Sequence, residues 1–230
     1  MQIDDIIEIK DKLNPKLWND FELKPEIKKA LLKISDAFLK FANIEKSTVK
    51  DILFVGSNAN YNWHNKSDID LHIVLDYKEC KDCYIFKVKE CVDYIKKNFN
   101  ERHDITIDKI PVEVYIQEED EVLNSVPVFS LKYDKWIKKP NRIKDVDVDK
   151  NEVKNKYTKI KKSIENLSDY EKVDELFKKI VKDRKEGLKD GGEFDEDNIV
   201  FKMLRSNGLL KKIVEKKNKL LSDKLSLDNK

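Results

Sequence analysis

Residues Asp51–Asp76 read DILFVGSNANYNWHNKSDIDLHIVLD, and this stretch decides the fold of the first half of the chain. It opens with a short apolar run that Gly56 ends, which is typical of a buried strand. Near its end, Ile69–Leu75 alternates between two faces, which predicts a second strand. A Gly-Ser turn and the polar residues 58–67 connect the two. The stretch therefore predicts two strands joined by a loop that starts on a glycine.

Two carboxylates stand at the start of the second strand. Asp68 and Asp70 are two residues apart, so they project from the same face with Cα atoms roughly 6–7 Å apart. Like charges at this spacing repel each other and gain nothing from an apolar core, whereas magnesium prefers one or two carboxylates together with phosphate oxygens. Two such ions about 3.5–4 Å apart can hold the attacking and leaving oxygens of a phosphoryl transfer. The pattern therefore predicts a Mg²⁺ or Mn²⁺ site.

The Gly-Ser turn suits the same chemistry. Gly56 lets the backbone approach phosphates closely, and Ser57 offers a hydroxyl and an N–H donor. The loop that follows is rich in asparagine, which favours turns, so turn formation is the first interpretation of these residues. Contact with a base or ribose is the alternative, with Trp63 as a residue that could stack on a base. The loop residues in question are Asn58, Asn60, Asn62 and Trp63.

The rest of the first 140 residues alternates helical and strand patterns. Pro25 is favoured in a first helical turn, and apolar residues at helical spacing follow it. The expected elements are a helix over Lys24–Phe41, a helix over Cys80–Phe99, a strand over Val112–Gln117 and a short strand over Phe129–Leu131. These elements predict a short mixed sheet with helices packed on one side.

From Asn141 onward the patterns that indicate strands stop. The expected elements are a helix over Glu152–Leu167, a helix that a capping box at Ser168–Glu171 opens and Gly187 ends, a loop over Lys189–Glu193, and two helices separated at Asn207–Gly208. The fold class is therefore predicted to be α/β (α+β), with a core domain over residues 1–140 and a helical region over residues 141–230.

Composition narrows the classes of protein. Charged residues make up 40% of the chain and no apolar run approaches the roughly 20 residues that a membrane span needs. Three cysteines without a secretory signal pattern indicate a reducing compartment, so a cytoplasmic location is expected. A net charge of only +2 does not indicate a nucleic-acid-binding face. Cys80, Cys83 and Cys91 are expected to pack rather than bind zinc, because no suitably spaced fourth ligand follows.

The ordered set of apolar strand, Gly-Ser, spacer and Asp-x-Asp resembles the nucleotidyltransferase superfamily typified by DNA polymerase beta. Members carry a third carboxylate on a later strand between apolar neighbours, and Glu113 stands between two valines. The resemblance implies that Asp68 and Asp70 bind both metals. It also implies that Glu113 helps to bind the catalytic metal and to deprotonate the acceptor hydroxyl. Gly56 and Ser57 would then hold the β- and γ-phosphates.

A weaker resemblance, to uncharacterised nucleotidyltransferase-like proteins of bacteriophages and bacteria, covers most of the chain and includes Lys135–Pro140 and Gly191–Phe194. It brings no assigned substrate, whereas the superfamily resemblance implies transfer of a nucleoside monophosphate from a nucleoside triphosphate to a hydroxyl, with release of pyrophosphate. The acceptor stays open between an RNA or tRNA end, a small molecule and a protein. The helical region would close over the nucleotide cleft.

Two alternatives belong to other classes of protein. One is a non-catalytic nucleotide sensor or antitoxin-like partner, which would not need all three carboxylates. The other is an RNA-binding protein whose helices carry the function, against which the lack of a concentrated basic stripe argues. His72 shares the strand face of the two aspartates and is interpreted first as a packing residue beside the site. The candidate cations for the triphosphate are Lys138, Arg184 and Lys185, with Lys139 and Arg142 as rivals.

Overall fold

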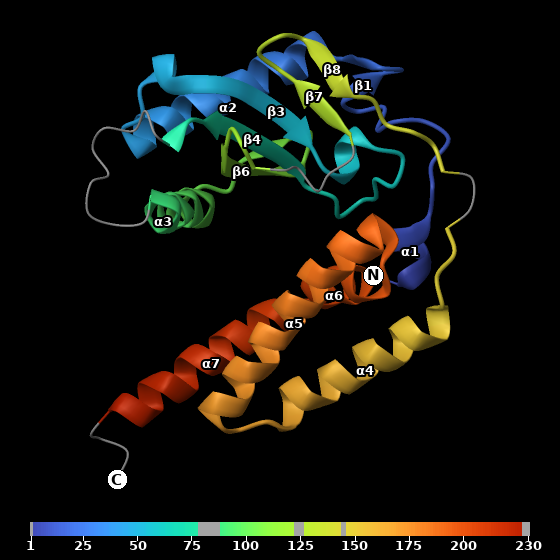
Figure 1. The fold of residues 1–230 in the computed structure, drawn as a ribbon, viewed down its shortest axis with the longest axis vertical. Helices are drawn as coiled ribbons and strands as arrows, with labels where there is room; N and C mark the ends of the chain where they lie inside the picture. Colours follow the sequence, from blue (N-terminus) through green and yellow to red (C-terminus); the bar gives the residue numbers. More distant parts are fainter. Residues whose placement is uncertain (1, 78–87, 122–126, 144–145, 227–230) are drawn as a thin grey trace. The chain divides into compact units, whose positions relative to one another are not determined.

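The computed structural model describes residues 2–77, 88–121, 127–143 and 146–226. The chain is mixed α/β, with the sheet in the first part and helices alone in the last part, so the predicted fold class is confirmed (Figure 1). Contacts divide it into two compact units. The sheet unit is Ile9–Lys144, and the helical unit is Met1–Glu8 together with Asp145–Lys230.

The unit boundaries differ from the expected ones at the amino terminus. The first eight residues were assigned to the core domain, but α1 (Ile3–Ile7) belongs to the helical unit. Its Ile3 and Ile6 side chains are buried in the core of that unit. A helix of five residues is too short to carry a readable period, and nothing in its own sequence says which core will bury its two isoleucines.

The main sheet has six strands in the order β5-β6-β4-β3-β7-β8. β4 and β6 are parallel, and the other neighbouring pairs are antiparallel. The strands are β3 (Val49–Val55), β4 (Ile69–Leu75), β5 (Thr106–Ile107), β6 (Ile110–Glu118), β7 (Val128–Ser130) and β8 (Lys135–Lys138). A separate hairpin joins β1 (Trp18–Asn19) to β2 (Glu22–Leu23).

Helices cover one face of this sheet, as expected. α2 (Pro25–Ala42) and α3 (Val88–Arg102) pack on it (Figure 1). The alternating apolar residues of β4 and β6 share one core with these helices. Phe38 of α2 and Phe99 of α3 meet edge to face in this core. Residues 80–87, where the second helix was expected to begin, lie outside the described residues. The opposite face of β4 and β6 carries the polar residues of the alternation.

Among the short elements that were not expected from the sequence, three meet in one aromatic cluster. The β1–β2 hairpin and β8 are held by aromatic packing rather than by their own residue pattern. Trp18 of β1 stacks on Phe54 and on Trp136, with ring centroids 5.3 and 4.8 Å away. Trp136 also donates a hydrogen bond from Nε1 to the carbonyl of Phe21, at 2.8 Å. Lys138, expected in a basic turn, is therefore the last residue of an edge strand.

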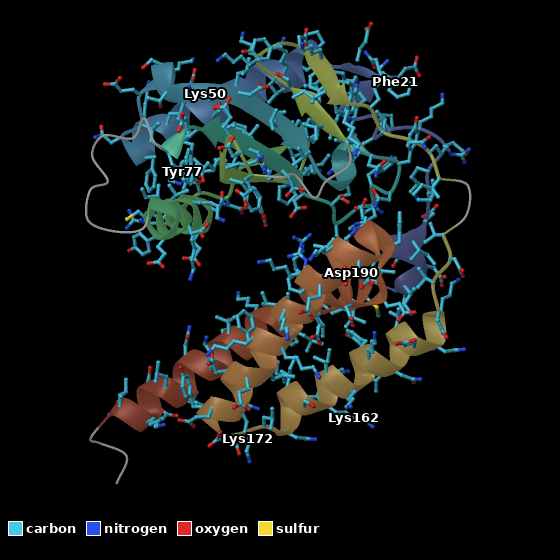
Figure 2. The ribbon with its side chains drawn as sticks, viewed as in Figure 1. Phe21, Lys50, Tyr77, Lys162, Lys172 and Asp190 are labelled. Carbon is cyan, nitrogen blue, oxygen red and sulfur yellow. The ribbon has the colours of Figure 1, made fainter. Side chains whose placement is uncertain are left out.

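The helical unit packs four long helices around its own apolar core. They are α4 (Lys150–Asn166), α5 (Tyr170–Asp190), α6 (Glu196–Ser206) and α7 (Leu209–Leu225). Lysines such as Lys162 and Lys172 project from the outer surfaces of the helices (Figure 2). Among the described residues, no helix combines the length and apolar character that crossing a membrane requires.

The limits of α5 differ from the predicted ones at both ends. Asp169, not Ser168, caps the helix by accepting a hydrogen bond from the Lys172 N–H at 3.0 Å. Gly187 does not end the helix but lies inside it, and a Cβ there would come within 2.0 Å of Asp195 Oδ1. Gly187 therefore allows Asp195 to pack closely against α5. The sequence alone does not distinguish a glycine with this role from one that ends a helix.

Candidate functional site

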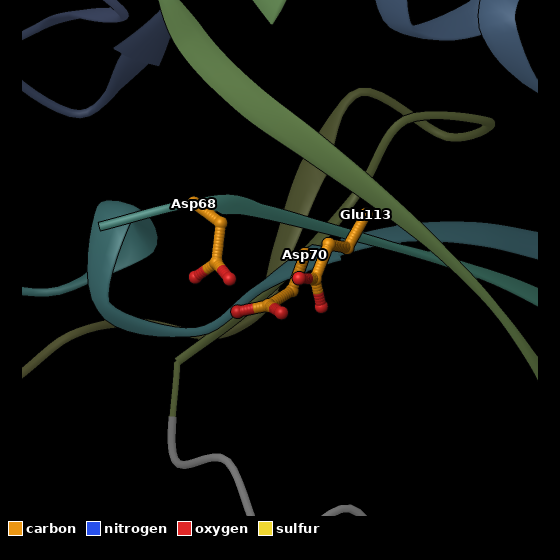
Figure 3. A group of neighbouring side chains, drawn as sticks. All are labelled: Asp68, Asp70 and Glu113. Atoms are coloured by element: carbon orange, nitrogen blue, oxygen red, sulfur yellow. The ribbon is translucent and has the colours of Figure 1, made fainter. Parts of the chain in front are cut away.

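The register of the sheet brings the three predicted carboxylates together. In the parallel pairing of β4 with β6, Asp70 lies directly opposite Glu113. Asp68 stands just before β4 and projects to the same face, because residues two apart in a strand share a face. One oxygen from each of the three carboxylates lies within 4.8 Å of the others (Figure 3). Three hard oxygen donors at this spacing are a ligand set that suits Mg²⁺ or Mn²⁺.

Gly56 ends β3 against one of these carboxylates. Its φ angle is +80°, a conformation that residues with a side chain rarely adopt. A Cβ at this position would lie 1.9 Å from Asp70 Oδ2. Two independent requirements, backbone conformation and space, therefore demand glycine here, and they place the start of the Gly-Ser turn directly beside Asp70.

The loop after the turn is fastened to the first aspartate. Ser57 begins a short 3₁₀ helix, η2 (Ser57–Ala59), and donates from Oγ to Ser67 Oγ at 2.8 Å. The buried Asn58 donates from Nδ2 to the carbonyl of Asp68 and accepts from Asn14 Nδ2, both at 2.8 Å. These bonds tie the two ends of the loop together and set the backbone from which Asp68 projects.

The other loop residues have structural roles of their own. Asn60 accepts from the Tyr61 N–H at 2.9 Å, which is turn chemistry. Trp63 donates from Nε1 to the carbonyl of Lys12 at 2.9 Å, so its indole is anchored to the chain. Asn62 is buried, and its Oδ1 has no hydrogen-bond partner among the described residues.

Tyr115 is a site residue that the sequence reasoning missed. Its hydroxyl donates to Glu113 Oε2 at 2.5 Å. Burial, followed by the negative charges of Asp70 and Glu113, raises the pKa of the Tyr115 phenol far above its ordinary value, so the hydroxyl stays a donor. The signal that could have found it is the alternation of β6, which sets Tyr115 two residues after Glu113 on the same face.

His72 packs beside this tyrosine rather than among the carboxylates. Its ring centroid is 4.9 Å from that of Tyr115. Its Nδ1 lies 2.8 Å from Gln117 Oε1, while Gln117 Nε2 donates to the carbonyl of Glu121 at 3.1 Å. The Gln117 amide therefore presents its oxygen, an acceptor, to His72. Nδ1 must donate to that oxygen, so it is the ring nitrogen of His72 that carries the proton. Burial lowers the pKa of His72, so the ring is neutral at physiological pH.

The basic candidates lie on other elements than the three carboxylates. Lys138 is exposed on β8, three strands from β4, which is roughly 14 Å at the usual strand spacing. Arg184 of α5 lies with Cζ 4.2 Å from the ring centroid of Phe201 in the helical unit, and Lys185 beside it is exposed.

The two rival cations, Lys139 and Arg142, contact other residues of the sheet unit. Lys139 Nζ lies 5.6 Å from the ring centroid of Phe21. Arg142 donates to Asp11 Oδ1 at 2.5 Å and to the carbonyl of Lys10 at 3.2 Å, within the sheet unit. Cys91 is a free, partly buried thiol, whereas Cys80 and Cys83 lie outside the described residues.

The chain was compared with models of protein families, with curated proteins and with solved structures. None of the three comparisons found a match. The function of the chain therefore has to be inferred from the chemistry of this site.

Proposed function

We propose that the chain is a metal-dependent nucleotidyltransferase that moves a nucleoside monophosphate from a nucleoside triphosphate to a hydroxyl acceptor in the cytoplasm, releasing pyrophosphate. One observation carries the proposal. Asp68, Asp70 and Glu113 come from neighbouring strands and present oxygens within 4.8 Å of one another, beside the Gly56-Ser57 turn. The same ordered set underlies the resemblance to the DNA polymerase beta superfamily.

The donor set fits a pair of divalent cations. It consists of carboxylate oxygens, which Mg²⁺ and Mn²⁺ prefer, and it contains no thiolate. Divalent ions held there would offset the charge that develops on the phosphates and favour ionisation of the acceptor hydroxyl. Asp68 and Asp70 would hold both ions, and Glu113 would hold the one nearer the acceptor.

Residues of the chain itself assist proton removal and hold the phosphates. In the transfer, a bond forms between the acceptor oxygen and the α-phosphorus, and the bond from that phosphorus to the bridging oxygen breaks. Pyrophosphate leaves with the bonding electrons, and Glu113 assists removal of the acceptor proton. The Gly56-Ser57 turn holds the β- and γ-phosphates: Gly56 lets the backbone approach them closely, and Ser57 offers its hydroxyl and its N–H.

The acceptor belongs to one of three classes: an RNA or tRNA end, a small molecule or a protein hydroxyl. Cations near the triphosphate add electrostatic stabilisation, which dominates catalysis of phosphoryl transfer. Lys138 of the sheet unit is our candidate for this role, and charge reversal at the exposed Lys185 tests its rival.

A transfer assay tests the proposal. The full chain is incubated with Mg²⁺, each α-labelled nucleoside triphosphate and fractions of a cell extract, and both covalently bound label and released pyrophosphate are measured. We expect label on one acceptor with the wild type and none with Asp70→Asn, whose fold is checked by circular dichroism. Tight nucleotide binding without transfer to any acceptor would favour the sensor instead. Binding that neither Mg²⁺ nor Asp70→Asn alters would exclude the metal site.

A further inference from the structure

Glu113 is hydrogen-bonded to a side chain of its own strand. Tyr115 Oη donates to Glu113 Oε2 at 2.5 Å. Both residues lie on β6, two positions apart, so the strand itself keeps them adjacent. A glutamate side chain has three rotatable bonds, and this contact removes the freedom of the last one.

We infer that Tyr115 is a positioning residue, which holds the Glu113 carboxylate so that Oε1 is presented to a cation together with Asp68 and Asp70. The inference rests on the proposed function and adds a residue to it. The phenol takes one lone pair of Oε2, which favours coordination of a cation through Oε1. It also sets the plane of the carboxylate before any cation arrives. Groups that orient metal ligands in this way typically change metal affinity or activity about 10- to 100-fold when removed.

The tyrosine ring is itself held from several sides. His72 packs at a centroid distance of 4.9 Å, and the Lys96 ammonium lies 5.1 Å from the ring centroid. His72 in turn is fixed through Gln117, whose amide is oriented by the carbonyl of Glu121. The phenol is thus the end of a packed polar row along the site face of β4 and β6, and its hydroxyl has little freedom to leave Glu113.

Tyr115→Phe removes the hydroxyl and keeps the ring, so contacts with His72 and Lys96 persist. The probe is Mn²⁺ alone, titrated into the full chain and followed by electron paramagnetic resonance and calorimetry. We expect wild-type binding, loss of binding in Asp70→Asn, and binding about 10-fold weaker or more in Tyr115→Phe. Tyr94→Phe on α3, a residue 71% exposed, is the matched control and should bind as the wild type does.

A double-mutant cycle separates positioning from general support of the fold. If Tyr115 acts through Glu113, Tyr115→Phe costs no further affinity in a Glu113→Gln background. Equal costs in both backgrounds, or wild-type Mn²⁺ affinity in Tyr115→Phe, would overturn the inference while leaving the proposed function standing. Absence of Mn²⁺ binding by the wild type would overturn the metal site itself. Melting temperatures of all variants, measured without metal, are expected to stay close to the wild type.

Discussion

Charged side chains are arranged differently at two places in the molecule, one in each unit. In the helical unit, acids and bases meet as opposite charges: Asp174 Oδ2 and Oδ1 lie 2.7 Å from Lys178 Nζ and 3.0 Å from Lys217 Nζ, respectively. In the sheet unit, three like charges converge within 4.8 Å at the ends of paired strands. Opposite pairs on a helical surface add a little stability, whereas converging carboxylates repel each other, and a bound cation would offset that repulsion. The ion pairs therefore support the fold, whereas the carboxylates are the group to which we assign the proposed chemistry.

The largest effect is expected from the third carboxylate. Glu113→Gln keeps the size of the side chain but removes the charge that assists deprotonation of the acceptor. Turnover should fall about 100-fold or more while nucleotide affinity changes little. Steady-state kinetics alongside equilibrium nucleotide binding would measure both quantities. Unchanged turnover would remove Glu113 from the mechanism and make Asp104 and Asp108 the next carboxylates to test.

Two glycines with positive φ, one in each unit, offer a matched pair. A Cβ at Gly56 would collide with Asp70, whereas a Cβ at Gly208 meets nothing within 4 Å. Gly208→Ala should lose about 1–2 kcal/mol of stability from its left-handed backbone, and Gly56→Ala about 1–3 kcal/mol, because φ +80° with ψ −168° is a conformation essentially limited to glycine. Only Gly56→Ala should also impair Mn²⁺ binding and transfer, by at least tenfold, because Asp70 must move. Equal effects of both variants on Mn²⁺ binding would show that the close approach at Gly56 has no role in the site.

A smaller effect is expected from the exposed cation of α5. Arg184 packs on Phe201, so its replacement would disturb the helical unit, but Lys185 is exposed and can be reversed without that cost. Lys185→Glu should weaken nucleoside triphosphate binding about tenfold if this lysine offsets triphosphate charge. Lys162→Glu on α4 is the control for a general change of net charge. Identical affinities for the two variants would move the role to Lys138.

The smallest effect concerns an ion pair of the helical unit. Hydrogen bonds from Lys178 and then Lys217 lower the pKa of Asp174. A lowered pKa means that this carboxylate stabilises the fold above its unfolded pKa and loses that contribution as the pH falls through the folded value. Asp174→Asn should therefore melt slightly below the wild type at neutral pH, and the difference should vanish in acid. Transfer activity should stay unchanged, and a large loss would contradict the division of roles between the units.

An element could be predicted from the sequence when the residues that determine it are close together in the chain, and was missed when they are far apart. β4 and α2 were predicted almost to the residue, because alternation and helical spacing record which face is buried. The β1–β2 hairpin was missed because it depends on Trp18 meeting aromatic residues far away in the chain. Gly187 was wrongly predicted to end a helix. A glycine stands there because the Asp195 side chain, eight residues further on, packs closely against it.

The same distinction between neighbouring and distant residues applies to the candidate site. The sequence by itself determined the mixed α/β order, the Gly-Ser turn and the spacing of Asp68 and Asp70, because neighbours in a strand have a set geometry. Only the tertiary structure decided that β6 lies parallel beside β4 with Glu113 opposite Asp70, and that the Tyr115 phenol reaches Glu113. Strand order and register depend on which surfaces the whole chain can bury together, and no local pattern encodes that outcome.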